Sequence, residues 1–327
     1  MNKQERLMAA ISGSEVDRVP VAAWSHQPVD DQSSDTFAAA TLAFQRNFDF
    51  DFVKVTPASS YCLTDWGATT YWKGNPHGTR DYGKALVQRL DDWSKLKVLD
   101  PHAGQMGEIV RGLELIGQGL EEGTPFIQTV FSPMTQARNL VGAEELLLHI
   151  RLHPDVIKDA FQIITDQTIS FIEAARETGI SGIFYALQWA SHLDLSESEY
   201  REFARPYDLQ ILQAVDDLWL NVLHLHGSHV MFSLIVDYPA SVLNWHDRET
   251  EPSLSEGLKS WPKAVCGGIR QEETLVQGTP KEIYAEGLDA IKSTNGKRLV
   301  LGTGCVAPIV TPYGNLRALR ELVELNL

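Results

Sequence analysis

The chain has 327 residues, of which 43% are hydrophobic and 22% charged, a composition typical of a soluble globular protein. With 43 acidic against 28 basic residues, its formal net charge of −15 argues against nucleic acid as a partner. Three scattered cysteines do not predict a disulfide framework. Neither a signal peptide nor a membrane-spanning run is predicted, so we expect a cytoplasmic protein.

Short runs rich in Val, Ile, Leu and aromatic residues recur along the chain and are separated by amphipathic stretches long enough for helices. Several runs are almost continuously apolar, as expected for parallel strands that are covered on both faces. The predicted strands are 19–24, 52–56, 125–131, 182–187, 218–225, 241–245, 264–269 and 298–302. Examples of predicted helices are 36–47, 153–178 and 280–293.

Helix starts are marked by local signals. Ser196 followed by Glu199 predicts a capping box that opens a helix at about Glu197. Thr279-Pro280 and Thr311-Pro312 each predict an N-cap residue followed by proline at the first helical position.

Eight strand–helix alternations predict a single-domain (β/α)8 TIM barrel over residues 1–327. The main alternative is an open doubly wound sheet. No Gly-x-Gly-x-x-Gly opens the first helix, where the residues after Trp24 are Ser-His-Gln-Pro, so the barrel is favoured. The segment 61–98 is predicted to be an elaborated loop that covers the barrel mouth.

Polar residues gather where the predicted strands end, which is where the active site of such a barrel forms. We expect His26 and His246 to be catalytic, with His26 as a general base. The residues expected to shape the substrate pocket are Ser132, Gln188, His192 and Asn244. His77, His102, His149 and His153 are given no role, and Glu249 is read as part of a solvated charged run.

One strand end carries two histidines, His224 and His226. Because side chains alternate along a strand, both imidazoles share the face opposite to Leu223 and Leu225. Cys305 follows a glycine-rich strand end and is the candidate third ligand of a zinc ion. A hydrogen-bonded polar pair and a small buried cysteine are the alternatives, and Cys62 and Cys266 are read as loop and core residues.

If one ion is bound, we expect an acceptor to fix the tautomer of each histidine. Asn244 and Asp247 are the nearest candidates by strand order.

Several short segments together resemble the uroporphyrinogen decarboxylase superfamily. They are His224-x-His226-Gly227, Asn244-Trp245, Gly267-Gly268 and Gly304-Cys305 with Pro308 and Thr311-Pro312, joined by Arg18-Val19-Pro20-Val21, Thr124-Pro125-Phe126 and Ser132-Pro133. The resemblance covers residues 3–325 or so and implies a (β/α)8 barrel.

One branch of this superfamily decarboxylates uroporphyrinogen III without metal, and binds its carboxylates through two arginines after the first strand. The matching stretch here, 24–31, contains no arginine and two aspartates. Ser59, Ser60 and Tyr61 occupy the region where that branch has its aspartate, and Asp65 lies beyond it. Uroporphyrinogen III is therefore expected to be a poor substrate.

The other branch comprises methylcobamide:thiol methyltransferases, whose His-x-Cys-Gly and Gly-Cys elements bind zinc. This chain is similar to them but has His226 in place of the first cysteine. The resemblance implies a zinc-assisted transferase that uses His224, His226 and Cys305, a small-molecule acceptor and a corrinoid donor on a partner protein. It also implies a homodimer by analogy.

Two alternatives remain open. The first is metal-free decarboxylation of uroporphyrinogen or a smaller carboxylate, in which His224, His226 and His246 supply acid catalysis. The second is a tetrapyrrole-binding module without turnover.

Overall fold

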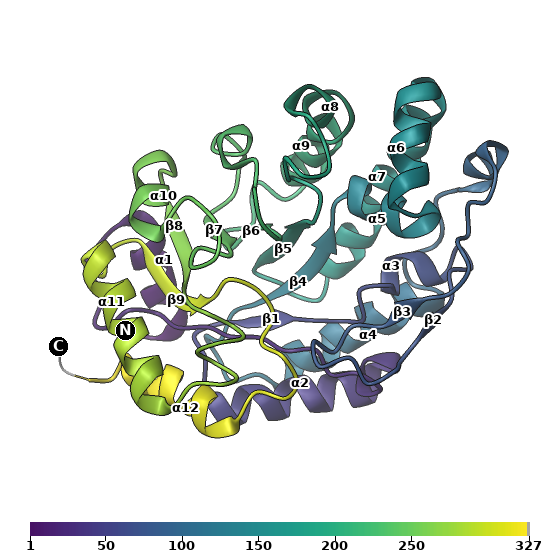
Figure 1. Ribbon diagram of the computed structural model, residues 1–327. Coiled ribbons are helices and arrows are strands. Elements are labelled where there is room, and N and C mark those ends of the chain that lie inside the picture. Colours follow the sequence, from purple (N-terminus) through teal and green to yellow (C-terminus); the bar gives the residue numbers. More distant parts are fainter. Residues whose placement is uncertain (326–327) are drawn as a thin grey trace.

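A curled parallel sheet of seven strands lies at the centre of the computed structural model, which describes residues 1–325 (Figure 1). The strand order is β1-β4-β5-β6-β7-β8-β9, and each neighbouring pair is parallel. The strands are β1 (Val53–Val55), β4 (Phe126–Phe131), β5 (Gly182–Leu187), β6 (Val222–Leu225), β7 (Val242–Trp245), β8 (Ala264–Ile269) and β9 (Leu299–Thr303). These seven strands confirm seven of the eight predicted runs.

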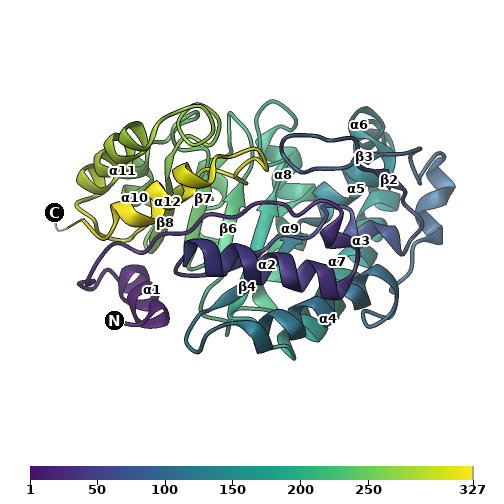
Figure 2. The same cartoon turned by 90° about the horizontal axis from the view of Figure 1, so that it is seen from below.

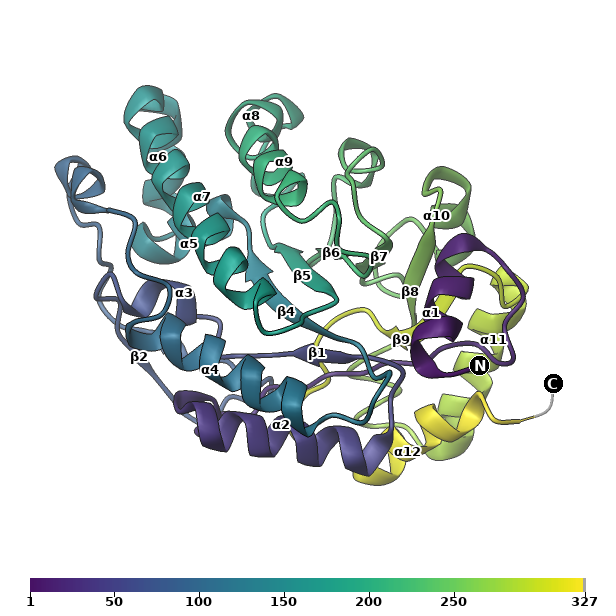
Figure 3. The ribbon, with the colours of Figure 1, turned by 180° about the vertical axis from the view of Figure 1, so that it is seen from behind.

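Helices cover the outer side of the sheet (Figures 1 and 3). Near β1, α2 and α4 pack side by side, as Figures 2 and 3 both show. The helices are α1 (Lys3–Ser12), α2 (Ser34–Phe48), α3 (Tyr61–Thr64), α4 (Gly104–Gly119), α5 (Pro133–Val141), α6 (Ala143–Leu152), α7 (Pro154–Arg176), α8 (Glu197–Phe203), α9 (Arg205–Gln213), α10 (Leu254–Ser260), α11 (Pro280–Thr294) and α12 (Tyr313–Leu322). Among the described residues, no helix has both the length and the apolar composition that a membrane crossing requires.

The first predicted strand, 19–24, does not form a regular strand. It makes one isolated parallel bridge, between Val21 and Leu301 of β9. Leu301 donates its backbone N–H to Pro20 O at 2.8 Å, and on the other side Asp51 donates to Val21 O at 2.9 Å. Proline has no N–H to donate and β1 is only three residues long, so a longer ladder does not form here. Of the predicted (β/α)8 barrel, the α/β class and a curled parallel sheet of seven strands are confirmed.

The predicted helix starts are correct at two of three places. Ser196 caps α8 with the expected capping box. Thr279 is the N-cap residue of α11 and Pro280 its first residue, as expected, and Glu282 adds a capping box there. At the third place the prediction was wrong by one position, because α12 begins at Tyr313 and Pro312 precedes it. The hydroxyl of Thr311 donates to Pro308 O at 2.6 Å, so it is not the cap.

The segment 61–98 carries α3, a short hairpin of β2 (Thr70–Tyr71) and β3 (Asp81–Tyr82), and a 3₁₀ helix over Leu90–Lys95. Its tip packs on the C-terminal ends of the strands, where Ile309 donates its N–H to Pro76 O at 2.8 Å. Gly78 has a φ of +77°, and a Cβ there would lie 2.4 Å from the Cβ of His26. Only glycine permits this approach, which places the segment over the mouth of the sheet.

Candidate metal centre

Four side chains with metal-binding atoms converge at the C-terminal ends of the strands. His224 lies in β6, His226 directly follows it, His246 follows β7 and Cys305 follows β9. One ligand atom from each lies within 4.8 Å of all the others. The Sγ atom of Cys305 is 3.6 Å from His224 Nε2 and 3.5 Å from His226 Nδ1. Three of these residues were predicted as ligands, and His246, predicted to be catalytic, joins them.

A glycine brings the thiol to this position. A Cβ on Gly304 would lie 2.7 Å from His246 Cα and 2.9 Å from Trp245 O. The backbone after β9 therefore runs against the end of β7 at a distance that a side chain at residue 304 would prevent. This contact places Cys305 beside the histidines.

Asn244 orients His224. Its Nδ2 donates to Cys266 O at 2.9 Å and to Thr303 O at 3.0 Å, so its Oδ1 faces His224 Nδ1, 2.7 Å away. Because an amide oxygen can only accept, His224 donates its Nδ1 proton to Asn244, and its Nε2 faces Cys305. Asn244 thus has the orienting role expected for one of the two candidates, and it is not among the described residues that line the cavity beside the cluster.

The other candidate orienting residue has a different role. Asp247 accepts the backbone N–H of Gly268 at 3.1 Å, and burial raises the pKa of its carboxyl to about 7. Instead, Glu249 lies with Oε2 3.2 Å from His246 Nδ1. The reading of Glu249 as a purely solvated residue is therefore corrected, since its carboxylate is the partner of a histidine in the cluster.

The cluster stabilises a thiolate among imidazoles. Burial raises the pKa of Cys305, but the charges and hydrogen bonds of His224 and His226 outweigh it, and the net pKa is well below the usual value. Burial lowers the pKa of His224. For His246, burial lowers the pKa, but contact with Cys305 and Glu249 outweighs it and raises the pKa overall. The Nε2 atom of His246 is buried without a hydrogen-bond partner among the described residues.

A cavity of about 300 Å³ opens beside the cluster. Its wall combines residues from the C-terminal ends of the strands with the tip of the 61–98 segment. The lining residues are His26, Lys54, Thr56, Ser59, His77, Thr79, Thr129, Phe131, Phe184, Ala186, Gln188, His224, His226, Gln271, Cys305 and Val306. His26, His224 and Cys305 therefore lie at the same end of the sheet, as predicted.

Lys54, in the middle of β1, is a cavity residue that the sequence interpretation missed. Its side chain is buried, and its Nζ lies 3.2 Å from Thr56 Oγ1 and 4.4 Å from the ring centroid of Phe184. Burial lowers the pKa of Lys54 to about 7. A single charge inside the apolar run Phe52-Val53-Lys54-Val55 is the signal that could have pointed to it, because lysine is rarely buried without a partner.

Two of the predicted site residues, His26 and Gln188, line the cavity. His26 does so, but burial and then the neighbouring Lys54 lower its pKa to about 3, which makes it a weaker base than a free imidazole. Gln188 also lines the cavity, and its Oε1 accepts from Arg138 at 2.8 Å. Its amide nitrogen is therefore the donor that remains for a ligand. His77, which was given no role, is part of the same wall.

Two other predicted residues lie elsewhere, and neither is among the described residues that line the cavity. Ser132 caps α5, where its hydroxyl accepts the backbone N–H of Thr135 at 3.2 Å. His192 is exposed. Asp65 is also outside the cavity, because its carboxylate accepts the N–H groups of Gln105 and Met106 at the start of α4.

A family model described as uroporphyrinogen decarboxylase (URO-D) matches residues 31–325. The chain belongs to the uroporphyrinogen decarboxylase family. Its curated relatives carry two kinds of name. The methylcobamide:CoM methyltransferase MtaA of Methanosarcina barkeri is 23% identical over 96% of this chain and 95% of its own length. The methylcobamide:CoM methyltransferase MtbA of Methanosarcina mazei is 22% identical over 74% of this chain and 70% of its own length.

The uroporphyrinogen decarboxylase of Chlorobaculum tepidum is 25% identical over 70% of this chain and 68% of its own length. Among solved structures, a methyltransferase from Methanosarcina mazei superposes with a TM-score of 0.86 at 20% identity, covering 99% of this chain and 98% of that one. This similarity shows that the two share a fold. The prediction that the chain is an enzyme of this family, either a transferase or a carboxy-lyase, is confirmed.

Proposed function

We propose that this family member transfers a methyl group from a corrinoid on a partner protein to a thiol or a similar small acceptor, with the help of a zinc ion. The observation that carries the proposal is the convergence of His224, His226, His246 and Cys305 at one end of the sheet, next to a cavity. The names of the curated methyltransferase relatives support the same reaction class.

The donor set suits zinc. Imidazole nitrogen and thiolate sulfur are its preferred ligands, and a catalytic site uses three protein ligands. The Nε2 of His224 already faces Cys305, whose thiolate form is favoured. We assign His224, His226 and Cys305 as the residues that would hold zinc. Zinc, when bound, supplies a Lewis acid that promotes ionisation of an acceptor thiol.

The remaining roles fall to residues beside these ligands. His246 accepts the thiol proton at Nε2, which is buried without a partner, and Glu249 stabilises the imidazolium that results. A methylcorrinoid, when presented at the cavity by its partner protein, would supply the methyl group to the acceptor sulfur and keep the electron pair of the broken bond. Phe131 and Phe184 in the cavity wall limit the access of water.

The structure favours methyl transfer over uroporphyrinogen decarboxylation. The cavity of about 300 Å³ lies at the small end of the range for ligand pockets, roughly 300–1,000 Å³, which suits a small molecule better than a four-ring macrocycle with eight carboxylates. Asp65 caps a helix and cannot act in the cavity. Family membership favours turnover over a binding module. We also interpret residues 20–22 as a short eighth strand that completes the barrel.

The test is zinc content and methyl transfer in protein purified without a histidine tag after growth with added zinc. We expect about one equivalent of zinc in the wild type and a clear loss in Cys305→Ala and His226→Ala. Cys62→Ala and His102→Ala are matched controls outside the cluster and should retain zinc. Zinc absent from all these proteins would overturn the metal assignment.

Transfer is measured with methylcobalamin as donor and a thiol as acceptor, by loss of the methylcobalamin spectrum and detection of the thioether by mass spectrometry. His246→Ala separates the role of the base from that of a ligand. We expect this variant to retain zinc but transfer methyl more slowly, with the rate recovering at higher pH as the thiol ionises unaided. Loss of zinc from His246→Ala would instead make His246 a ligand.

A further inference from the structure

The tip of the 61–98 segment, residues 74–79, forms part of the wall of the cavity beside the cluster. His77 and Thr79 of the tip line this cavity together with Cys305. We infer that the tip is a gate, held over the cavity by the contact between His77 and Glu272, and that its displacement opens a path from solvent to the Cys305 thiol. This role does not depend on the function proposed above.

Few contacts hold the tip in place. Among the described residues, two polar contacts join residues 72–79 to the chain outside the segment. Ile309 donates its N–H to Pro76 O at 2.8 Å, and His77 Nε2 lies 3.4 Å from Glu272 Oε1. The side chains of His77 and Glu272 are 48% and 42% exposed, so solvent weakens the pair. The hairpin that carries the tip has only two pairs of residues, and the tip can therefore leave its position at a small cost in free energy.

The two ends of the segment, by contrast, are fixed to the rest of the fold. Tyr61 is buried and donates its hydroxyl proton to Thr129 O at 2.8 Å. Trp93 is also buried and donates its Nε1 proton to His149 Nδ1 at 3.1 Å. A movement of the tip therefore bends the segment between these two anchors, as a hinged loop does.

The closed position of the tip depends on Gly78. Its φ is +77°, and a Cβ there would lie 2.4 Å from His26 Cβ and 3.0 Å from Ile309 Cγ2. Gly74 has nearly the same φ, +78°, but no described atom beyond its chain neighbours lies within 4 Å of the position of its Cβ. The two glycines share the left-handed backbone conformation, and only Gly78 also packs closely on the mouth of the sheet.

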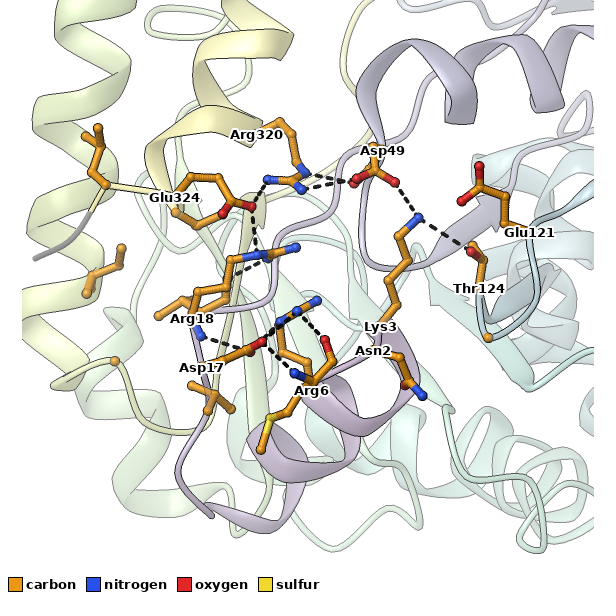
Figure 4. Close-up of a pocket in the computed structure, with 18 of the residues that line it drawn as sticks. Asn2, Lys3, Arg6, Asp17, Arg18, Asp49, Glu121, Thr124, Arg320 and Glu324 are labelled. Carbon is orange, nitrogen blue, oxygen red and sulfur yellow. Dashed lines mark hydrogen bonds and ion pairs between the residues drawn. The ribbon is translucent and has the colours of Figure 1, made fainter.

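The opposite end of the sheet is closed in a different way. A hollow of about 800 Å³ there is lined by the first residues of the chain and the end of α12 (Figure 4). Several ion pairs hold its walls together: Lys3 with Asp49, Arg6 with Asp17, Arg18 with Glu324, and Arg320 with both Asp49 and Glu324. At the mouth, one hydrogen bond and one exposed pair hold the tip. The comparison favours the mouth as the end that opens.

The test measures how fast the Cys305 thiol is alkylated in the full chain after dialysis against a chelator. Iodoacetamide is the small reagent and fluorescein maleimide the large one, and peptide mass spectrometry assigns the labelling to each cysteine. A change in the reactivity of the thiol alters both rates alike, whereas a gate affects the large reagent more. Cys266 is fully buried and should stay unlabelled in every folded protein.

We expect Gly78→Ala to react with the large reagent at least about tenfold faster than the wild type, because the added methyl group prevents closure. Its rate with iodoacetamide should rise by a smaller factor. Gly74→Ala is the matched control: it carries the same backbone strain without the clash and should be labelled more slowly than Gly78→Ala. Glu272→Gln, which removes the charge that faces His77, should accelerate the large reagent about two- to fivefold.

Equal labelling rates in Gly74→Ala and Gly78→Ala would overturn the gate, as would a rise in Gly78→Ala by the same factor for both reagents. A wild-type rate in Glu272→Gln would overturn the part of His77 and Glu272 in holding it. Labelling of Cys266 in Gly78→Ala would show that this variant has unfolded, and Glu272→Gln, at a half-exposed position, then decides alone. Because the labelled protein holds neither metal nor methyl donor, the result is independent of the proposed function.

Discussion

Asp51 and Lys54 are separated by only Phe52 and Val53, yet the surroundings of their charges differ. Asp51 lies at the base of the sheet, with its carboxylate 2.6 Å from Arg6 Nη1 and 2.7 Å from Arg18 Nη1. Lys54 lies in the wall of the cavity at the other end, and its charge has no carboxylate partner among the described residues. The difference separates a charge that holds the fold together from one that lies in the wall of a cavity.

The largest loss of stability is expected at the base of the sheet, where Asp51 lies. Asp51→Ala leaves two largely buried guanidinium groups without their shared carboxylate and removes the acceptor of the Val21 N–H at 2.7 Å. We expect the free energy of unfolding to fall by about 3–5 kcal/mol, measured by urea denaturation. Asp159→Ala, at an exposed position on α7, should change it by less than about 0.5 kcal/mol. A loss below about 1 kcal/mol in Asp51→Ala would mean that the base does not depend on this cluster.

In the cavity, by contrast, we expect removal of a charge to increase the free energy of unfolding. Lys54→Met removes a buried charge and should stabilise the protein at neutral pH by about 2–4 kcal/mol, from ~1.4 kcal/mol per pKa unit. Below pH 7 the lysine is protonated in both the folded and the unfolded chain, so its full destabilising effect is present. As pH rises from about 7 to 10.5, the folded chain releases the proton first and the effect declines. The measurement is the unfolding free energy of both proteins across this range; a destabilised variant would show that Lys54 supports the fold.

Asp208 is a third buried charge, and the stability change expected from altering its surroundings is the smallest of the three. Asp208 accepts hydrogen bonds from Tyr185, Tyr200 and Tyr238, at 2.7, 2.8 and 3.1 Å, and burial raises its pKa to about 6. Tyr200→Phe should lower the free energy of unfolding by about 1.5 kcal/mol and raise the pKa of Asp208 further. The pKa is followed by NMR of the carboxyl carbon, and the exposed Tyr71→Phe is the control. An unchanged pKa would show that the hydroxyl of Tyr200 does not stabilise this carboxylate.

The strands could be predicted from the sequence because each is an apolar run that is buried on both faces. The segment 19–24 is the exception. Its apolar residues predict a strand, but whether a ladder forms depends on its neighbours, the short β1 and the backbone of β9. Pro20 contributes an acceptor and no donor there, which a pattern of side chains does not reveal.

The candidate site was predictable in so far as it depends on alternation and strand order. These two rules place His224, His226 and Cys305 together. The single charge in the apolar run of β1 marks Lys54 as unusual, but it does not show what surrounds the side chain, because Phe184 comes from β5. Glu249 was missed because the turn after β7, in which its N–H donates to His246 O, brings its carboxylate back to the imidazole.

Asn244 links four strands through one amide group. From β7 it contacts His224 of β6 and donates to backbone carbonyls at Cys266 of β8 and Thr303 of β9. Hydrogen bonding within the sheet thus sets the position of the His224 imidazole relative to the chain that leads to Cys305. For the zinc site proposed above, the entropy of ordering the ligands would therefore be lost during folding, and an ion would enter and leave an already assembled site.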